Sequence, residues 1–76
     1  MSLNLQISYD NGKSDYIRVS PSDKIGDVKK TLSNQEDAVW KWGNSTLKNT
    51  KTFGDYEFDD NDIIYSNQRN KGGKNY

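Results

Sequence analysis

The sequence predicts an α+β domain, in which strands precede and follow a single helix. Three patterns support this prediction. Residues 3–7 alternate between apolar and polar side chains, as in a half-buried strand. Residues 25–32 instead carry apolar side chains at helical spacing. Residues 39–42 return to the alternation of a strand. The chain has 76 residues, so we expect one small domain.

A β-hairpin is predicted at the start of the chain. The inward positions of its first strand are apolar: Leu3, Leu5 and Ile7. Asn11 and Gly12 tolerate the positive φ angles of a tight turn between two strands. Ile17 and Val19 continue the inward face on the second strand, which leaves Tyr16 pointing outward.

A helix is predicted after residues 21–23, because Pro-Ser-Asp ends the strand and supplies residues that cap helices. Its apolar stripe is formed by three side chains: Ile25, Val28 and Leu32. Lys29 lies largely off this stripe and is expected to be exposed. The helix is expected to end within residues 33–37, which support no further stripe.

The rest of the chain predicts short elements joined by polar turns. Residues 39–42 place Trp40 and Trp42 on one face. These side chains could stack on a ligand, but their spacing beside Leu47 favours the core. Four further segments follow, namely a short strand at residues 46–47, a helical turn at 52–56 capped by Thr52, an acidic turn at 59–62 and a last strand at 63–65. The acidic turn lacks the twelve-residue pattern of a calcium loop, so a solvated turn is preferred.

Composition excludes several classes of function. The sequence has no cysteine and no histidine, so it lacks a thiol nucleophile and the usual general base, and we expect neither an enzyme nor a cofactor or metal site. Eleven basic and eleven acidic residues cancel, whereas nucleic-acid binders show a basic excess. No apolar run reaches membrane length. We therefore expect a soluble domain in the cytoplasm or nucleus, with protein partners.

The predicted order of elements is that of the β-grasp fold, a mixed sheet of four or five strands packed on one helix. Residues 19–29 resemble the strand-to-helix segment of ubiquitin. Residues 52–56, Thr-Phe-Gly-Asp-Tyr, resemble its Thr-Leu-Ser-Asp-Tyr segment, and residues 69–73 resemble its Arg-Leu-Arg-Gly-Gly ending. The resemblance covers nearly the whole chain to Gly73 and indicates a divergent ubiquitin-like protein. It also implies that the hydroxyl of Tyr56 closes the neighbouring loop.

This resemblance implies a ubiquitin-like modifier. Residues 1–68 would form the domain and residues 69–76 a flexible polar tail. A protease would trim the precursor after Gly73, and the new carboxyl terminus would form an isopeptide bond with other proteins. Gly72 and Gly73 would be the processing and conjugation site, and Arg69 matches the position that selects the activating enzyme. Five lysines could accept conjugation: Lys13, Lys24, Lys29, Lys30 and Lys51. The alternative is a non-conjugated ubiquitin-like domain that acts as an interaction module in a larger assembly.

The recognition surface departs from the ubiquitin pattern. Three apolar residues form the main recognition patch of the family, and this sequence has Asp10, Lys41 and Asn67 at those positions. Receptors that need the apolar patch are therefore not expected to bind, and the free protein is expected to be a monomer. Tyr16 and Tyr65 point outward by strand parity and could form a replacement interaction face. Ordinary cross-strand packing of these tyrosines is the alternative.

Overall fold

The described strands and helix follow the predicted order. The computed structural model describes residues 2–32 and 35–68. Its elements are β1 (Leu3–Tyr9), β2 (Ser14–Val19), α1 (Ile25–Lys30), β3 (Val39–Trp42), β4 (Ser45–Thr46), the 3₁₀ turn η1 (Phe53–Asp55) and β5 (Ile63–Asn67). The sites predicted at Arg69, Gly72 and Gly73 lie outside the described residues, as does the rest of the tail.

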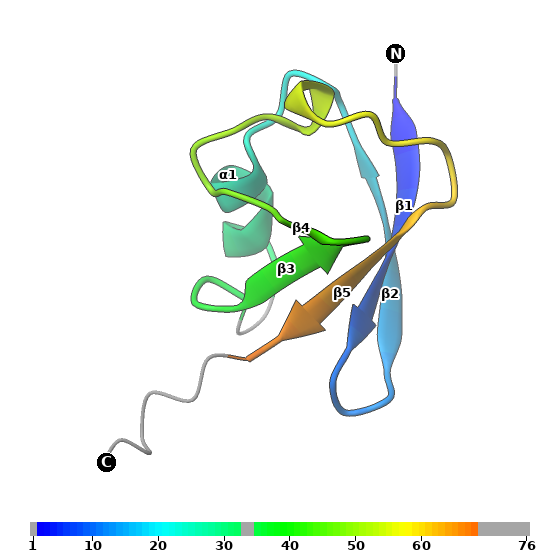
Figure 1. Ribbon diagram of the computed structural model, residues 1–76, viewed down its shortest axis with the longest axis vertical. Coiled ribbons are helices and arrows are strands. Elements are labelled where there is room, and N and C mark those ends of the chain that lie inside the picture. The colour runs from blue at the N-terminus through cyan, green and yellow to red at the C-terminus, as the bar shows by residue number, and fades with distance from the viewer. Residues whose placement is uncertain (1, 33–34, 69–76) are drawn as a thin grey trace.

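The sheet places the first and last strands of the chain side by side. Its order is β2-β1-β5-β3-β4, and β1 runs parallel to β5. The other three pairs are antiparallel. Helix α1 lies against one face of the sheet (Figure 1), and the described residues contain no second α-helix to cover the opposite face. This arrangement confirms the β-grasp fold.

The first hairpin forms as predicted around Gly12. The amide of Tyr9 donates to the carbonyl of Lys13 at 2.8 Å, and the amide of Lys13 donates to Oδ1 of Asn11 at 3.0 Å. Gly12 has a φ of 87°, a conformation that glycine adopts without steric cost. Leu5 faces Ile17 across the two strands. The turn therefore fixes a register that keeps the apolar positions on one face.

The interior combines the sheet, the helix and η1 in one cluster. Its buried members are Leu5, Ile7, Val19, Ile25, Ala38, Trp40, Leu47, Phe53, Phe58 and Ile64. Val28, Leu32 and Trp42 pack against this cluster while remaining partly exposed. The ring centroid of Trp42 lies 4.4 Å from that of Phe58. Trp40 thus lies in the core and Trp42 packs against it, as the strand alternation predicted.

The start of α1 differs from the prediction. Ser22 and Asp23 do not cap the helix, since the carboxylate of Asp23 accepts the amide of Ser20 at 2.9 Å in the preceding turn. The first helical amides donate instead to carbonyls of a distant loop. The amide of Ile25 donates to the carbonyl of Lys51, and the amide of Gly26 donates to the carbonyl of Asn49. The helix is also shorter than expected and ends at Lys30. Loop carbonyls therefore satisfy amide groups that a side-chain cap would otherwise serve.

The position of Lys29 corrects a second expectation. Its side chain is only 3% exposed, and its Nζ donates to the carbonyl of Ala38 at 2.8 Å and to Oδ1 of Asn49 at 2.7 Å. Lys29 lies four residues after the buried Ile25, so it shares the inward helical face. Because its amine is buried and hydrogen-bonded, Lys29 is not accessible as an acceptor for conjugation.

The loops between β4 and β5 follow the predicted chemistry. The amide of Lys48 donates to the hydroxyl of Tyr56 at 3.0 Å, which confirms that this tyrosine closes the loop. The amide of Thr52 donates to Oδ2 of Asp55 at 2.9 Å, so Asp55 and Thr52 together secure the start of η1. In the acidic turn, Asp60 accepts the amide of Asn4 at 3.0 Å. The acidic turn thus has a structural role at the end of the sheet.

Two classes of feature are not found in the part of the chain that the structure describes. No helix there is long and apolar enough to cross a membrane. No group of three or more acidic side chains there could hold a metal ion.

Candidate protein-binding face

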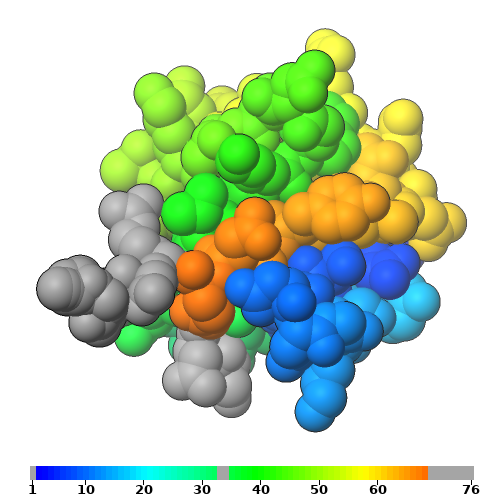
Figure 2. All heavy atoms as spheres, turned by 60° about the horizontal axis from the view of Figure 1, so that its bottom comes forward, coloured from blue at the N-terminus to red at the C-terminus, as the bar shows by residue number. Residues whose placement is uncertain are grey.

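The outer face of the sheet, opposite α1, is formed by alternate residues of four adjacent strands. Cross-strand partners share a face, so the register identifies its members. They are Asn4, Gln6 and Ser8 of β1, Ser14, Tyr16 and Arg18 of β2, Val39 and Lys41 of β3, and Ile63, Tyr65 and Asn67 of β5. In Figure 2 the orange atoms of β5 lie at the surface between the blue atoms of β1 and β2 and the green segment that contains β3.

Three large apolar side chains are exposed on this face. Tyr16 is 79% exposed, Tyr65 is 54% exposed and Ile63 is 37% exposed. Gln6 pairs with Tyr16 on one side and with Ile63 on the other. Tyr65 follows two positions after Ile63 on the same face. We call Tyr16, Ile63 and Tyr65 the outer stripe.

The outer stripe contains all the exposed large apolar side chains found among residues 2–32 and 35–68. Exposed apolar side chains that gather on one face indicate a binding surface more strongly than the same side chains scattered singly. The prediction that Tyr16 and Tyr65 point outward agrees with the structure. Ile63 was not among the predicted site residues. Its neighbour Ile64 is fully buried, and strand parity then requires Ile63 to face the other way.

The three positions of the family's apolar patch form a polar corner beside this stripe. Lys41 pairs with Tyr65, and Asn67 pairs with Val39. The carboxylate of Asp10 accepts the amide of Gln68 at 3.2 Å, at the end of β5. Asp10, Lys41 and Asn67 are all exposed. This corner therefore presents polar groups where a patch-reading receptor needs apolar contact.

The charged side chains at the outward strand positions have one sign, while the carboxylates of Asp10 and Asp60 lie in loops at the ends of the strands. Arg18 and Lys41 are the charged side chains among the outward strand positions, and no carboxylate occupies such a position. Nε of Arg18 donates to Oδ1 of Asn4 at 3.3 Å, so the guanidinium group lies along the sheet surface. Two cations and three exposed apolar side chains therefore share the outward strand positions.

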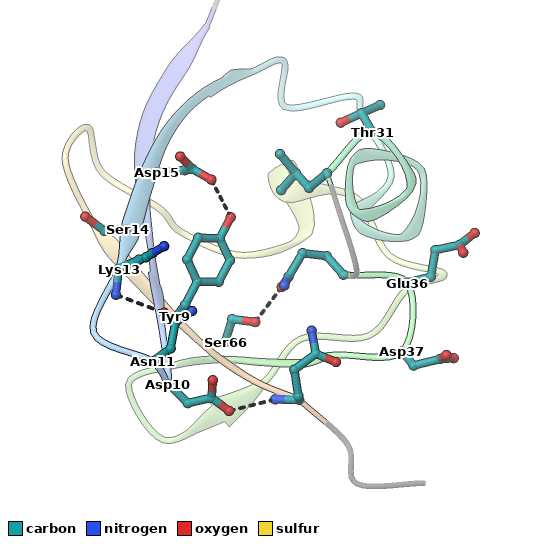
Figure 3. A pocket seen from close by; sticks show the side chains of 13 residues that line it. Tyr9, Asp10, Asn11, Lys13, Ser14, Asp15, Thr31, Glu36, Asp37 and Ser66 are labelled. Atoms are coloured by element: carbon teal, nitrogen blue, oxygen red, sulfur yellow. Dashed lines mark hydrogen bonds between the residues drawn. The ribbon is translucent and has the colours of Figure 1, made fainter. Parts of the chain in front are cut away.

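A depression of about 930 Å³ lies between the first hairpin and the loop that precedes β3 (Figure 3). The hydroxyl of Tyr9 donates to Asp15 at 2.8 Å within it. Burial, together with this hydrogen bond and the charge of Asp15, raises the pKa of Tyr9 to about 12. Deeper in the fold, Oε1 of Gln35 accepts Nε1 of Trp40 at 3.0 Å and the hydroxyl of Ser66 at 2.5 Å. These contacts join polar side chains to one another and support the fold.

Comparison with solved structures identifies the fold. The chain is similar to the crystal structure of the UBL domain of Plasmodium falciparum Dsk2, with a TM-score of 0.80 and 18% sequence identity. The alignment covers 91% of this chain and all of that domain. No family model and no curated protein matches the sequence. The fold is therefore ubiquitin-like, as the sequence predicted.

Proposed function

We propose that this ubiquitin-like domain is a protein-interaction module that binds partners through the outer face of its sheet. The observation that carries the proposal is the outer stripe of Tyr16, Ile63 and Tyr65. Tyrosine is enriched among residues that dominate binding energy, because it combines a large contact area with a polar hydroxyl. The stripe lies on rigid strands, so binding would order little further chain.

The partners of this module would differ from those that read ubiquitin through its apolar patch. Asp10, Lys41 and Asn67 offer no apolar pocket at that corner, and burying their polar groups without new partners would cost free energy. Compared with that patch, the outer stripe places the exposed apolar side chains nearer to β1 and β2. This shift supports an interaction domain with its own set of partners, and we propose that the domain is not conjugated and acts in the cytoplasm or nucleus. The lack of histidine and cysteine in the sequence supports a function without catalysis.

Conjugation is the second candidate function, and it is supported by the sequence. Arg69, Gly72 and Gly73 match the ending that ubiquitin-like modifiers use, and residues 74–76 would be the part removed. The outer stripe is compatible with this candidate, because a conjugated modifier also needs a face that partners recognise. The two functions are therefore tested separately.

A photo-crosslinking experiment tests the interaction face. A photoreactive phenylalanine is placed at position 16 of the full chain, and a control copy carries it at position 30, which is exposed on the helix side. We expect protein crosslinks from position 16 that disappear when Ile63→Asp and Tyr65→Asp are added. Equal crosslinking from both positions, or crosslinks that survive these substitutions, would refute the proposal.

Conjugation is tested with a tag at each end of the chain, expressed in the cell of origin. Loss of the carboxyl-terminal tag and a ladder of heavier species carrying the other tag would support trimming and attachment. Gly73→Ala should abolish such a ladder. A single species that keeps both tags would exclude conjugation in those cells and leave the interaction module as the function.

A further inference from the structure

We propose that Asn11 is a site of spontaneous deamidation, and that its conversion to isoaspartate loosens the first hairpin as the protein ages. The site is the pair Asn11 and Gly12 in the turn between β1 and β2. The inference concerns the covalent chemistry of the chain itself and goes beyond the proposed interaction function. Its evidence is the residue that follows Asn11, the exposure of the turn and the hydrogen bonds made by the reacting groups.

The sequence puts Asn11 in the most reactive local context for this chemistry. Deamidation begins when the main-chain nitrogen of the next residue attacks the side-chain carbon Cγ of an asparagine. A side chain on that next residue hinders the approach, and glycine has none. Of all the asparagines in the sequence, only Asn11 is followed by glycine. Asn11 is therefore expected to react before the others.

The folded turn leaves room for the cyclic intermediate. Asn11 and Gly12 are both exposed. A Cβ added to Gly12 would have nothing within 4 Å beyond the adjacent residues. A succinimide ring, which joins the Asn11 side chain to the Gly12 nitrogen, therefore meets no neighbouring segment, and solvent reaches both reacting groups.

Two hydrogen bonds act on the reacting atoms. The amide of Gly12 donates to the carbonyl of Tyr9 at 3.2 Å, at the long end of the range for such bonds, so the attacking nitrogen is held weakly. The amide of Lys13 donates to Oδ1 of Asn11 at 3.0 Å. Negative charge develops on Oδ1 when Cγ is attacked, and a donor already placed at that atom stabilises this charge.

The reaction consumes water and releases ammonia. Hydroxide removes the proton of the Gly12 amide, and the nitrogen forms a bond to Cγ of Asn11. The bond from Cγ to the side-chain nitrogen breaks, and this nitrogen takes a proton from water and leaves as ammonia, which restores the hydroxide. Water then opens the succinimide. Attack at Cγ gives aspartate, whereas attack at the main-chain carbonyl carbon gives isoaspartate.

Isoaspartate lengthens the turn. Its main chain passes through the former side-chain carbons, which adds one atom between β1 and β2. The length of a hairpin loop fixes the register of its strands. The longer turn therefore opposes the closing hydrogen bond, in which the amide of Tyr9 donates to the carbonyl of Lys13 at 2.8 Å.

The change is expected to reach the end of β5 through Asp10. The carboxylate of Asp10 accepts the amide of Gln68 at 3.2 Å, so it ties the turn to the end of that strand. Either product places a new carboxylate at position 11, directly beside Asp10, and like charges repel. We therefore expect the effects of deamidation at the turn and at Gln68, while the buried core stays intact.

Ageing of the purified full chain tests the chemical step. Samples are held at neutral and at mildly alkaline pH, and peptide mass spectrometry with electron-transfer fragmentation separates aspartate from isoaspartate. Asn61 is the internal control, because it is also exposed in a turn but is followed by Asp62. We expect Asn11 to react at least about tenfold faster than Asn61, to react faster at alkaline pH, and to give isoaspartate.

NMR spectra of fresh and aged protein test the structural consequence. The resonances of Tyr9, Lys13 and Gln68 should change with ageing, and those of the buried Trp40 should not. Asn11→Gln keeps an amide at the position but lengthens the side chain, so its spectrum should stay unchanged on ageing. Asn61→Gln is the matched control and should age like the native sequence.

Several outcomes would overturn the inference. In the ageing experiment these are equal rates at Asn11 and Asn61, a rate that does not rise with pH, or aspartate without isoaspartate. In the spectra they are unchanged Tyr9 and Lys13 resonances in the deamidated protein, or the same changes in aged Asn11→Gln. The comparison within one native sample does not depend on the folding of any variant.

Discussion

Nζ of Lys29 lies 2.7 Å from Oδ1 of Asn49, a side chain that comes twenty residues later in the chain. The same ammonium group donates to the carbonyl of Ala38 at 2.8 Å and lies 5.4 Å from the centre of the Trp40 ring. One buried cation thus ties α1 to the start of β3 and to the loop after β4. These contacts replace the hydration that the charge loses on burial.

Lys29→Met should therefore destabilise the fold by about 2–3 kcal/mol, because it leaves a buried carbonyl and an amide oxygen without this donor. Urea unfolding followed by tryptophan fluorescence measures the change. Lys30→Met is the matched control, since Lys30 is the next residue and is exposed. Its expected effect is within about 0.5 kcal/mol. Equal stability of the two variants would contradict the role of Lys29.

Burial of Lys29 should also protect it from chemical modification. Acetylation of the folded protein, followed by mass spectrometry, should label Lys30 faster than Lys29, because the Lys29 amine is held by two acceptors. In urea the two rates should converge. Labelling of both lysines at the same rate in the native protein would show that the burial does not persist in solution.

Gly26→Ala should destabilise the protein even though alanine favours helices. An added Cβ would lie 3.0 Å from Cβ of Asn49 and 3.1 Å from its carbonyl oxygen. The helix gains about 1 kcal/mol from the substitution, whereas overpacking costs about 1–3 kcal/mol. Asp27→Ala, at an exposed position of the same helix, is the control. A stabilised Gly26→Ala protein would show that the loop at Asn49 moves away readily.

Neighbouring isoleucines on β5 provide a test of the two faces. Ile64→Ala should cost about 2–5 kcal/mol, because Ile64 is fully buried and its truncation leaves a cavity. Ile63→Ala should cost less than about 1 kcal/mol, since this side chain faces solvent. Thermal or urea unfolding of both variants gives the comparison. Similar losses would mean that the outer face is covered in the free protein.

The raised pKa of Tyr9 leads us to expect that the free energy of unfolding falls at alkaline pH. Its pKa rises from 10.0 to about 12 in the folded protein, so above pH 10 the unfolded chain ionises first and the folded state becomes less stable. The stability from this group is complete below pH 10 and is lost by about pH 12. Unfolding midpoints measured across this window should fall more steeply for the native sequence than for Tyr9→Phe. Parallel curves would contradict the assignment.

Local patterns were enough to predict most of the elements. The turn at Asn11 and Gly12, the alternation around Trp40 and the capped turn at Thr52 depend on residues within a few positions of one another. Backbone preference and side-chain periodicity act over that range, so the hairpin, β3 and η1 could be placed before the structure was known. The same parity argument placed Tyr16 and Tyr65 outside, and it would have placed Ile63 there too.

Contacts between segments that are distant in the sequence could not be predicted from local patterns, because they form only in the folded chain. Lys29 is polar and was expected at the surface, but acceptors from residues 38 and 49 make its burial favourable. The start of α1 differs from the prediction for a similar reason, because carbonyls of residues 49 and 51 accept hydrogen bonds from its first amides. Alternation tells which way a side chain points, since it depends only on the neighbouring backbone. Which side chains of different strands become neighbours depends on strand order and register, so Arg18, the outer stripe and Lys41 align only once β1 and β5 have paired.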